Sequence, residues 1–264
     1  MKPLRNSLLI VFLAGWATAQ NVAPPPDADA AEAALKNSPR HGEFIFIDLP
    51  GGGKMKTWVV YPERSTKAPV ILVIHEIFGM TDWANSVADH LASQGFIAIA
   101  PDMIYGVEAE GNTISIVRNL PDEERVLRLN AAREYGMKLP AATGKVGSIG
   151  FCWGGYTSFL YAVNQPDLDA AVVCYGSSPD TESLKNAKAP ILGLYGGDDA
   201  RVNTTIPAAE EELKKSGKSF EHEIYPGAGH GFFRQQKGRN GANMAAATKG
   251  WERAVTFFRE HLEE

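Results

Sequence analysis

The chain has 264 residues, with 31 acidic and 26 basic side chains and a net charge of −5 at neutral pH. Its lysines and arginines are scattered along the sequence, so the electrostatic footprint of a nucleic-acid-binding protein is absent. Only two cysteines are present, which excludes a disulfide framework and a four-cysteine zinc site.

The first residues have the pattern of a secretory signal peptide. Lys2 and Arg5 give a positive start, Ser7 to Trp16 form an apolar stretch, and Ala17 to Ala19 provide a small-residue cleavage site. The apolar stretch is short of the roughly 20 residues that a spanning helix needs, which favours cleavage over a membrane anchor. We predict a signal peptide over residues 1–19, an exported protein in the periplasm or outside the cell, and no membrane span after cleavage.

Residues 20–42 are expected to be an extended or mobile leader. They contain three consecutive prolines, Pro24 to Pro26, and a run rich in alanine. No repeat or second linker divides the remainder, so residues 43–264 are predicted to form a single domain with a substantial core.

This domain is expected to open with an antiparallel hairpin, whose strands over 43–49 and 57–61 are joined by three glycines. The aliphatic run Pro69 to Ile74 is typical of a strand buried on both faces. Strands and helices then alternate, apart from an irregular stretch over 103–120. The further strands are predicted at 96–100, 170–175, 191–195 and 220–225, and the helices at 82–94, 121–139, 153–164, 205–216 and 243–262.

The alternation predicts an α/β protein with a mostly parallel central sheet and helices on both faces. In such sheets, ligands bind at the carboxyl ends of the strands. The candidate functional residues of this chain all follow predicted strand ends.

The stretch Lys145 to Tyr156, KVGSIGFCWGGY, predicts a strand that enters a helix directly through a tight turn at Cys152. Gly150 and Gly154 stand two residues to either side, where a larger side chain would collide with the adjoining strand or helix. The N-terminus of the new helix would favour a thiolate and a neighbouring oxyanion. Taken alone, the pattern also fits a glycine-rich turn that holds an inert buried cysteine.

Two later strand ends carry Asp199 and His230. With Cys152 they give the order nucleophile, acid, histidine, which is the chain order of α/β-hydrolases. His230 would exchange the thiol proton and later protonate the leaving group, while Asp199 would fix the tautomer of the imidazole. Each residue alone has an ordinary turn interpretation, but the set in this order predicts a hydrolase.

Four segments, HEIFG after the strand ending at Ile74, GFCWGG at the turn, GGDDARV and GAGHGFFR, resemble the dienelactone hydrolase family of α/β-hydrolases over roughly residues 43–262. The resemblance implies the α/β-hydrolase fold and the opening of a lactone or carboxylic ester through an acyl-enzyme. The catalytic roles map to Cys152, Asp199 and His230. Neither a metal nor an organic cofactor is implied.

The resemblance also gives Glu76 of the HEIFG segment a role, which is to contact the resting thiol and take part in forming the thiolate. A partly desolvated carboxylate after a hydrophobic strand suits such proton exchange. The alternative is a salt-bridged glutamate that stabilises the loop. The backbone amides of Trp153 and Ile77 are the expected oxyanion donors.

For the substrate, Arg234 matches the carboxylate-binding arginine of the family, four residues after His230. Tyr105 is a candidate for the wall of the substrate pocket. The family's other substrate arginine has no clear counterpart, because the chain reads PDMIYGVEAEG at that point. The expected partner is a small ester or lactone whose identity the sequence leaves open.

Three alternatives stay open. The protein could be an esterase or thioesterase for another small acyl substrate, or a non-catalytic ligand-binding protein on the same scaffold. Export could also allow Cys152 to form a disulfide with Cys174. The oligomeric state is open between a monomer and a small homo-oligomer.

Overall fold

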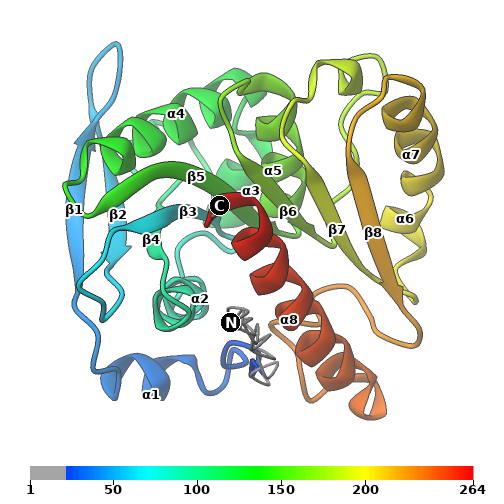
Figure 1. Ribbon diagram of the computed structural model, residues 1–264, viewed down its shortest axis with the longest axis horizontal. Helices are drawn as coiled ribbons and strands as arrows, with labels where there is room; N and C mark the ends of the chain where they lie inside the picture. Colours follow the sequence, from blue (N-terminus) through cyan, green and yellow to red (C-terminus); the bar gives the residue numbers. More distant parts are fainter. Residues whose placement is uncertain (1–21, 264) are drawn as a thin grey trace, which may run out of the picture.

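The computed structural model describes residues 22–263, so the predicted signal peptide lies outside the described residues. These residues form an eight-stranded sheet in the order β1-β2-β4-β3-β5-β6-β7-β8, with helices on both faces (Figure 1). The strands are β1 (Gly42–Asp48), β2 (Lys54–Val60), β3 (Ala68–Ile74), β4 (Ile97–Pro101), β5 (Ala142–Phe151), β6 (Ala170–Cys174), β7 (Ile191–Gly196) and β8 (Phe220–Tyr225). The α-helices are α1 (Ala31–Lys36), α2 (Asp82–Ser93), α3 (Thr113–Asn119), α4 (Asp122–Lys138), α5 (Trp153–Asn164), α6 (Ala200–Asn203), α7 (Ile206–Lys215) and α8 (Ala242–Leu262).

The pairing confirms the predicted sheet. Strands β1 and β2 form the antiparallel hairpin, in which Gly42 lies opposite Val60 and Asp48 opposite Lys54. Strand β2 is also antiparallel to β4, and every other neighbouring pair is parallel. The carboxyl ends of β3, β5, β6 and β7 therefore lie along one edge of the sheet, where the candidate site residues follow them.

Two hydrophobic cores cover the sheet. One lies between the sheet and α1, α2 and α8, and the other between the sheet and α4, α5 and α7. All seven residues of β3 are buried, as its continuous aliphatic run predicts. Burial of each large aliphatic side chain stabilises the fold by roughly 1.5–3 kcal/mol, so the central strands hold the site on a rigid support.

The stretch predicted to be irregular contains a helix, α3. Asn112 caps its N-terminus, because its side chain accepts a hydrogen bond of 3.0 Å from the amide of Ser115. The helix itself reads TISIVRN, in which the β-branched residues lower the helix propensity. The prediction of an irregular stretch is wrong here because the cap and packing override a weak local preference.

The leader also contains a helix, α1, whose first residue Ala31 is buried. Before it, residues 22–30 form what we call the N-terminal strap. The Nε1 atom of Trp83 donates to the carbonyl of Pro26 at 3.1 Å, and the ring of His90 bonds the carbonyl of Ala23 at 2.8 Å. Proline has no amide hydrogen to donate, so the strap attaches to α2 through its carbonyl groups.

The other side of the strap holds the loop that follows His230. Gln236 is buried and donates from Nε2 to the carbonyl of Pro25 at 2.7 Å. The amide of Ala28 donates to the carbonyl of Arg234 at 3.0 Å. The described part of the leader thus joins α2 to the histidine loop instead of extending away from the domain.

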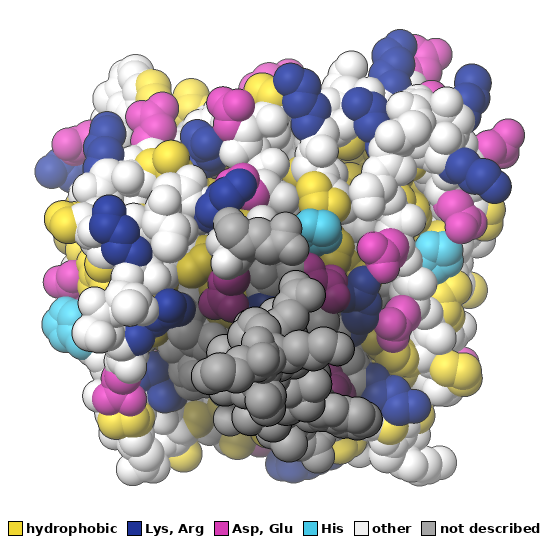
Figure 2. Space-filling model, in the orientation of Figure 1, with side chains coloured by type: hydrophobic (Ala, Val, Ile, Leu, Met, Phe, Trp, Pro, Cys, Tyr) yellow, Lys and Arg dark blue, Asp and Glu magenta, His cyan; other side chains and the backbone are white. Residues whose placement is uncertain are grey.

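Basic and acidic side chains lie interspersed over the face that Figure 2 shows, in agreement with their scatter along the sequence. Within residues 22–263, no helix has the length and apolar character needed to cross a membrane.

Candidate active site

The turn between β5 and α5 places Cys152 in a strained backbone conformation. Its φ of 57° and ψ of −113° lie outside the common regions for a non-glycine residue, at a cost of roughly 1–3 kcal/mol. The amide of Cys152 donates to the carbonyl of Cys174 at 3.0 Å, and the amide of Tyr156 donates to the carbonyl of Cys152 at 3.2 Å. The surrounding sheet and helix therefore hold the strained turn, and both cysteines carry free thiols.

Glycine is required on both sides of this turn. A Cβ atom at Gly150 would overlap the carbonyl of Gly154, and one at Gly154 would overlap the carbonyl of Ile74 in β3. No shift of a side chain relieves an overlap with backbone. The glycine spacing thus lets α5 approach β3 and β5 closely enough for the turn to form.

The structure brings His230 and Asp199 to this turn. His230 Nδ1 lies 2.5 Å from Asp199 Oδ2, and the carboxylate of Asp199 is buried. Burial acts to lower the pKa of His230, but hydrogen bonds with Asp199 and Cys152 raise it to about 9. Since Asp199 occupies Nδ1, the other ring nitrogen is left for the sulfur. These contacts favour the protonated imidazole of His230, which lies between the carboxylate of Asp199 and the thiol group of Cys152.

Glu76 lies behind the same site in a buried ion pair. Its Oε2 is 2.7 Å from Nε of Arg234, although the N–H direction does not give an aligned hydrogen bond. Burial raises the pKa of Glu76, whereas the nearby Arg234, Tyr175 and His230 act to lower it. The Arg234 guanidinium also stacks on the ring of Phe78, at 4.7 Å from its centroid. Without a substrate, the structure thus pairs Arg234 with Glu76, and its expected role in binding a substrate carboxylate stays a prediction.

The neighbouring His75 is structural. It is fully buried, its Nδ1 lies 2.7 Å from the carbonyl of Glu76, and its Nε2 accepts from the amide of Met103 at 3.2 Å. These partners fix the neutral tautomer that is protonated on Nδ1. Burial lowers the pKa of His75, which also favours the neutral ring, and this ring stacks on the indole of Trp153.

The expected oxyanion donors flank the nucleophile. Trp153 is the first residue of α5, so its amide has no acceptor within the helix. The amide of Ile77 has no backbone acceptor among the residues that the structure describes. Both residues line the cavity that contains Cys152, so both amides are available at the site.

This cavity has a volume of about 580 Å³. Its walls hold a set of cationic side chains that sequence reasoning missed, because they come from separate segments with no common motif. Tyr105 is not among the lining residues: its ring packs on Phe46, at 5.6 Å between centroids, beside the outer hairpin. The lining residues are Ile77, Arg118, Asp122, Arg125, Cys152, Trp153, Tyr156, Tyr175, Ser177 and Arg201.

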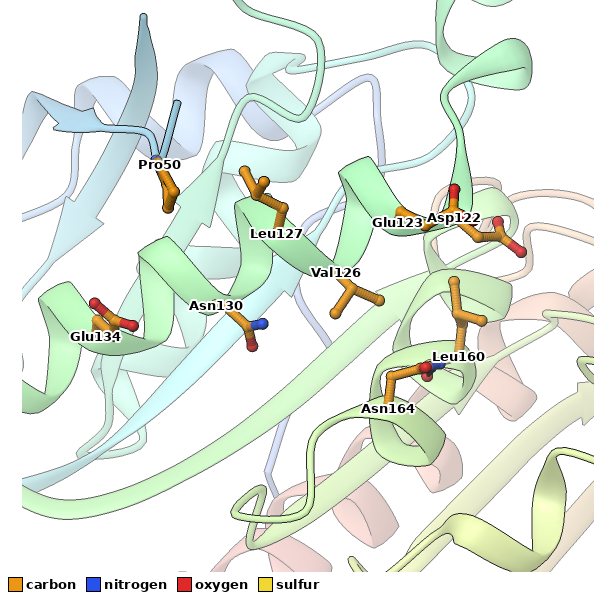
Figure 3. Close-up of a pocket in the computed structure, with 9 residues that line it drawn as sticks. All are labelled: Pro50, Asp122, Glu123, Val126, Leu127, Asn130, Glu134, Leu160 and Asn164. Atoms are coloured by element: carbon orange, nitrogen blue, oxygen red, sulfur yellow. Dashed lines mark hydrogen bonds between the residues drawn. The ribbon is translucent and has the colours of Figure 1, made fainter. Parts of the chain in front are cut away.

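A second cavity, of about 510 Å³, lies along α4 and α5 next to Pro50 (Figure 3). Its walls carry Val126, Leu127 and Leu160, with amide and carboxylate side chains around them. Only Asp122 is shared with the cavity around Cys152. The second cavity is lined by neither a cysteine nor a histidine, so it lacks both members of the predicted thiol–imidazole pair.

Comparison with known proteins identifies the family. A sequence profile described as "Dienelactone hydrolase family" matches residues 55–262. A Saccharolobus solfataricus relative is 32% identical, covering 81% of this chain and 97% of its own. An Escherichia coli K12 relative is 29% identical, covering 93% and 97%. Both relatives bear the name "Putative carboxymethylenebutenolidase".

A solved structure from Klebsiella pneumoniae, described as a "Putative Dienelactone Hydrolase", superposes with a TM-score of 0.72. It is 26% identical and covers 83% of this chain and 99% of its own. These matches confirm the expected fold and the expected enzyme class, a hydrolase that acts on ester bonds. The chain belongs to the dienelactone hydrolase family.

Proposed function

We propose that the protein hydrolyses a carboxylic ester or lactone through an acyl-enzyme on Cys152. The observation that carries this proposal is the pairing of His230 with Asp199 and Cys152, which raises the pKa of His230 to about 9 although burial opposes it. A protonated imidazole beside a thiol is the partner that stabilises a thiolate nucleophile.

The steps follow from these contacts. The Cys152 thiolate attacks the carbonyl carbon, and the amides of Trp153 and Ile77 stabilise the resulting oxyanion. His230 gives its proton to the departing alkoxide, which leaves a thioester on Cys152. Neutral His230 then takes a proton from water, the hydroxide displaces the thiolate, and the acid is released. Asp199 supports the charged imidazole in the first step and its tautomer in the second.

Glu76 is proposed to take part in forming the thiolate. Its carboxylate is buried, and burial raises its pKa above the ordinary value, which makes it a better proton acceptor than an exposed carboxylate. In this structure Glu76 is paired with Arg234. Proton uptake by Glu76 would therefore require this ion pair to loosen when a substrate arrives.

The curated relatives bear a name that refers to lactone opening, and a lactone is a cyclic ester open to the same attack. We therefore extend the proposal to lactones as well as open-chain esters. Aryl esters are suitable first probes, because their good leaving groups place little demand on substrate positioning.

Hydrolysis of p-nitrophenyl acetate by three forms of the protein tests the proposal. We expect turnover by the unchanged enzyme and by Cys174→Ala, and a loss of at least about a thousandfold in Cys152→Ala. Cys174 is the matched control because it is the only other thiol and is fully buried. Equal turnover by both variants would exclude a thiol mechanism. Ligand binding without turnover in any form would favour the binding-scaffold alternative.

We also propose that the protein is exported after cleavage of residues 1–19. The support is the signal-like pattern of that segment. N-terminal sequencing of protein from a periplasmic or secreted fraction tests this, with Gln20 as the expected first residue. An intact N-terminus on cytoplasmic protein would contradict it.

A further inference from the structure

We propose that the substrate carries two negatively charged groups and that Arg118 and Arg201 bind them on either side of Cys152. This inference rests on the proposed function, because it assigns a substrate class to the same site. It starts from the charge of the cavity, whose walls hold three arginines and one aspartate.

Of the three arginines, Arg125 already has partners within the protein for its charge and its hydrogen-bond donors. It is buried, its Nε donates to the carbonyl of Leu120 at 2.9 Å, and its Nη1 lies 3.3 Å from Asp122. Its guanidinium packs on the rings of Trp153 and Tyr156, at 4.6 and 5.3 Å from the two centroids. Arg125 and Asp122 therefore form a neutral pair that supports one wall of the cavity.

The hydroxyl of Tyr156 completes this wall by donating to Asp122 at 2.8 Å. Asp122 thus accepts from Tyr156, and its negative charge is offset by the neighbouring guanidinium of Arg125. The wall is pre-formed, and it leaves the charges of Arg118 and Arg201 uncompensated.

Arg118 and Arg201 are exposed on the cavity wall. Across residues 22–263, neither side chain has a carboxylate within 4.0 Å or a protein hydrogen-bond acceptor. A guanidinium that lines a cavity with its donors unused is suited to a carboxylate, which it can bind through two parallel hydrogen bonds. The two arginines therefore offer two such positions.

Topology places the two positions on opposite sides of the nucleophile. Arg118 belongs to α3, which follows β4, and Arg201 belongs to α6, which follows β7. In the sheet, β4 and β7 lie on opposite sides of β5, the strand that ends at Cys152. An ester held at Cys152 would thus extend one part toward each arginine. This arrangement fits an anionic group on the acyl side and another on the alcohol side.

A set of four aryl esters tests the two anionic groups of the proposed substrate separately. Phenyl acetate is neutral, phenyl hydrogen adipate has a carboxylate on the acyl side, para-acetoxybenzoate has one on the alcohol side, and para-carboxyphenyl hydrogen adipate has both. We expect kcat/KM to rise about tenfold for each carboxylate, relative to the ester of the set that lacks that carboxylate. One charge-assisted contact is worth roughly 1.4 kcal/mol or more.

Arg118→Gln and Arg201→Gln should each lower the anionic-to-neutral preference about tenfold, one for each position of the carboxylate. Arg64→Gln is the matched control. Arg64 bonds the carbonyl of Gly95 near the opposite edge of the sheet, so its loss changes the net charge equally but should leave the preference unchanged.

The outcomes separate this inference from the proposed function. If Cys152-dependent turnover of the neutral ester occurs without any preference for the anionic esters, the two-anion inference is overturned and the hydrolase stands. An equal loss of preference in Arg64→Gln would also overturn it, because the effect would then come from long-range charge alone. If the folded enzyme turns over no ester, the proposed function is contradicted, and the two-anion inference that rests on it falls with it.

Discussion

The charged side chains on the two sides of Cys152 differ in whether they have partners within the protein. On the side of Glu76, Asp199 and His230, each charged group has a partner inside the protein. On the side of the cavity, Arg118 and Arg201 line the wall without a carboxylate partner among the described residues. The first side is assembled before a substrate arrives, and the second is incomplete without one.

This difference separates the residues that carry out the reaction from those that select the substrate. The paired groups are those that donate and accept protons in the proposed reaction, and their contacts are made without an ester present. The unpaired arginines contribute only when a ligand supplies the opposite charge. Changes on the paired side should therefore alter turnover of every ester, whereas changes on the open side should alter the choice between esters.

The largest expected effect is on the paired side, in Asp199→Asn. The neutral amide supports neither the imidazolium nor its tautomer, so kcat/KM should fall by roughly 10² to 10⁴. Asp198→Asn is the control, because Asp198 is half-exposed and, within residues 22–263, its side chain pairs with Arg239 alone, on the surface. A comparable loss in Asp198→Asn would mean that the wrong aspartate has been assigned.

The same variant tests which group causes the alkaline limb of the pH profile. In the unchanged enzyme, kcat/KM should decline above about pH 9 as His230 loses its proton. Removal of the Asp199 hydrogen bond takes away a cause that raises the pKa of His230 and leaves the lowering effect of burial. The alkaline limb should therefore move to lower pH in Asp199→Asn, and an unmoved limb would exclude His230 as its origin.

A smaller effect, on stability, is expected in Arg234→Gln. Removal of Arg234 leaves the buried Glu76 unpaired and should lower the free energy of unfolding by about 3 kcal/mol at pH 8. Because burial already raises the pKa of Glu76, its charged form is disfavoured in the folded state. The deficit should therefore shrink as pH falls toward 5 and Glu76 takes up a proton.

Denaturant unfolding at the two pH values measures this deficit. Arg239→Gln is the control, since its pair with Asp198 is half-exposed on both sides and should contribute less than about 1 kcal/mol. A deficit in Arg234→Gln that is equal at both pH values would show that Glu76 is not the group responsible.

The smallest effect is expected where the strap holds the histidine loop. Gln236→Ala removes the donor to the carbonyls of Pro25 and Phe233 and should cost roughly 1–3 kcal/mol of stability. The adjacent Gln235 is exposed, so Gln235→Ala should cost less than about 0.5 kcal/mol. Protease cleavage within residues 22–30 should become faster in Gln236→Ala only. Equal cleavage of both variants would show that Gln236 does not hold the strap.

The comparison also explains what the sequence could predict. The turn at Cys152 was predictable because strand, glycines, nucleophile and helix are consecutive, and their collisions are local. Asp199 and His230 were predictable because each follows a strand of a predicted parallel sheet, whose carboxyl ends share one edge, and because their order after Cys152 is that of α/β-hydrolases. Arg118 and Arg201 were not, since they come from short helices 83 positions apart in the chain and only the fold brings them to one cavity.

The surroundings of the two expected substrate residues were not predictable for a related reason. Arg234 was chosen because it matches the family's carboxylate-binding arginine four residues after His230, and neither the match nor the spacing shows its ion pair with Glu76. Tyr105 was chosen as an aromatic residue near a strand end, but its ring packs on Phe46 instead. The leader was predicted to be extended or mobile from its composition, which does not indicate the contacts that its backbone makes with α2 and the histidine loop.

The central claim is a covalent acyl group on Cys152, and its most direct test is intact-mass analysis of enzyme quenched in acid during turnover of p-nitrophenyl pivalate, whose bulky acyl group slows deacylation. We predict one added acyl mass that peptide mapping places on Cys152 and that is absent in Cys152→Ala. Turnover without any adduct, or an adduct on a residue other than Cys152, would contradict the account.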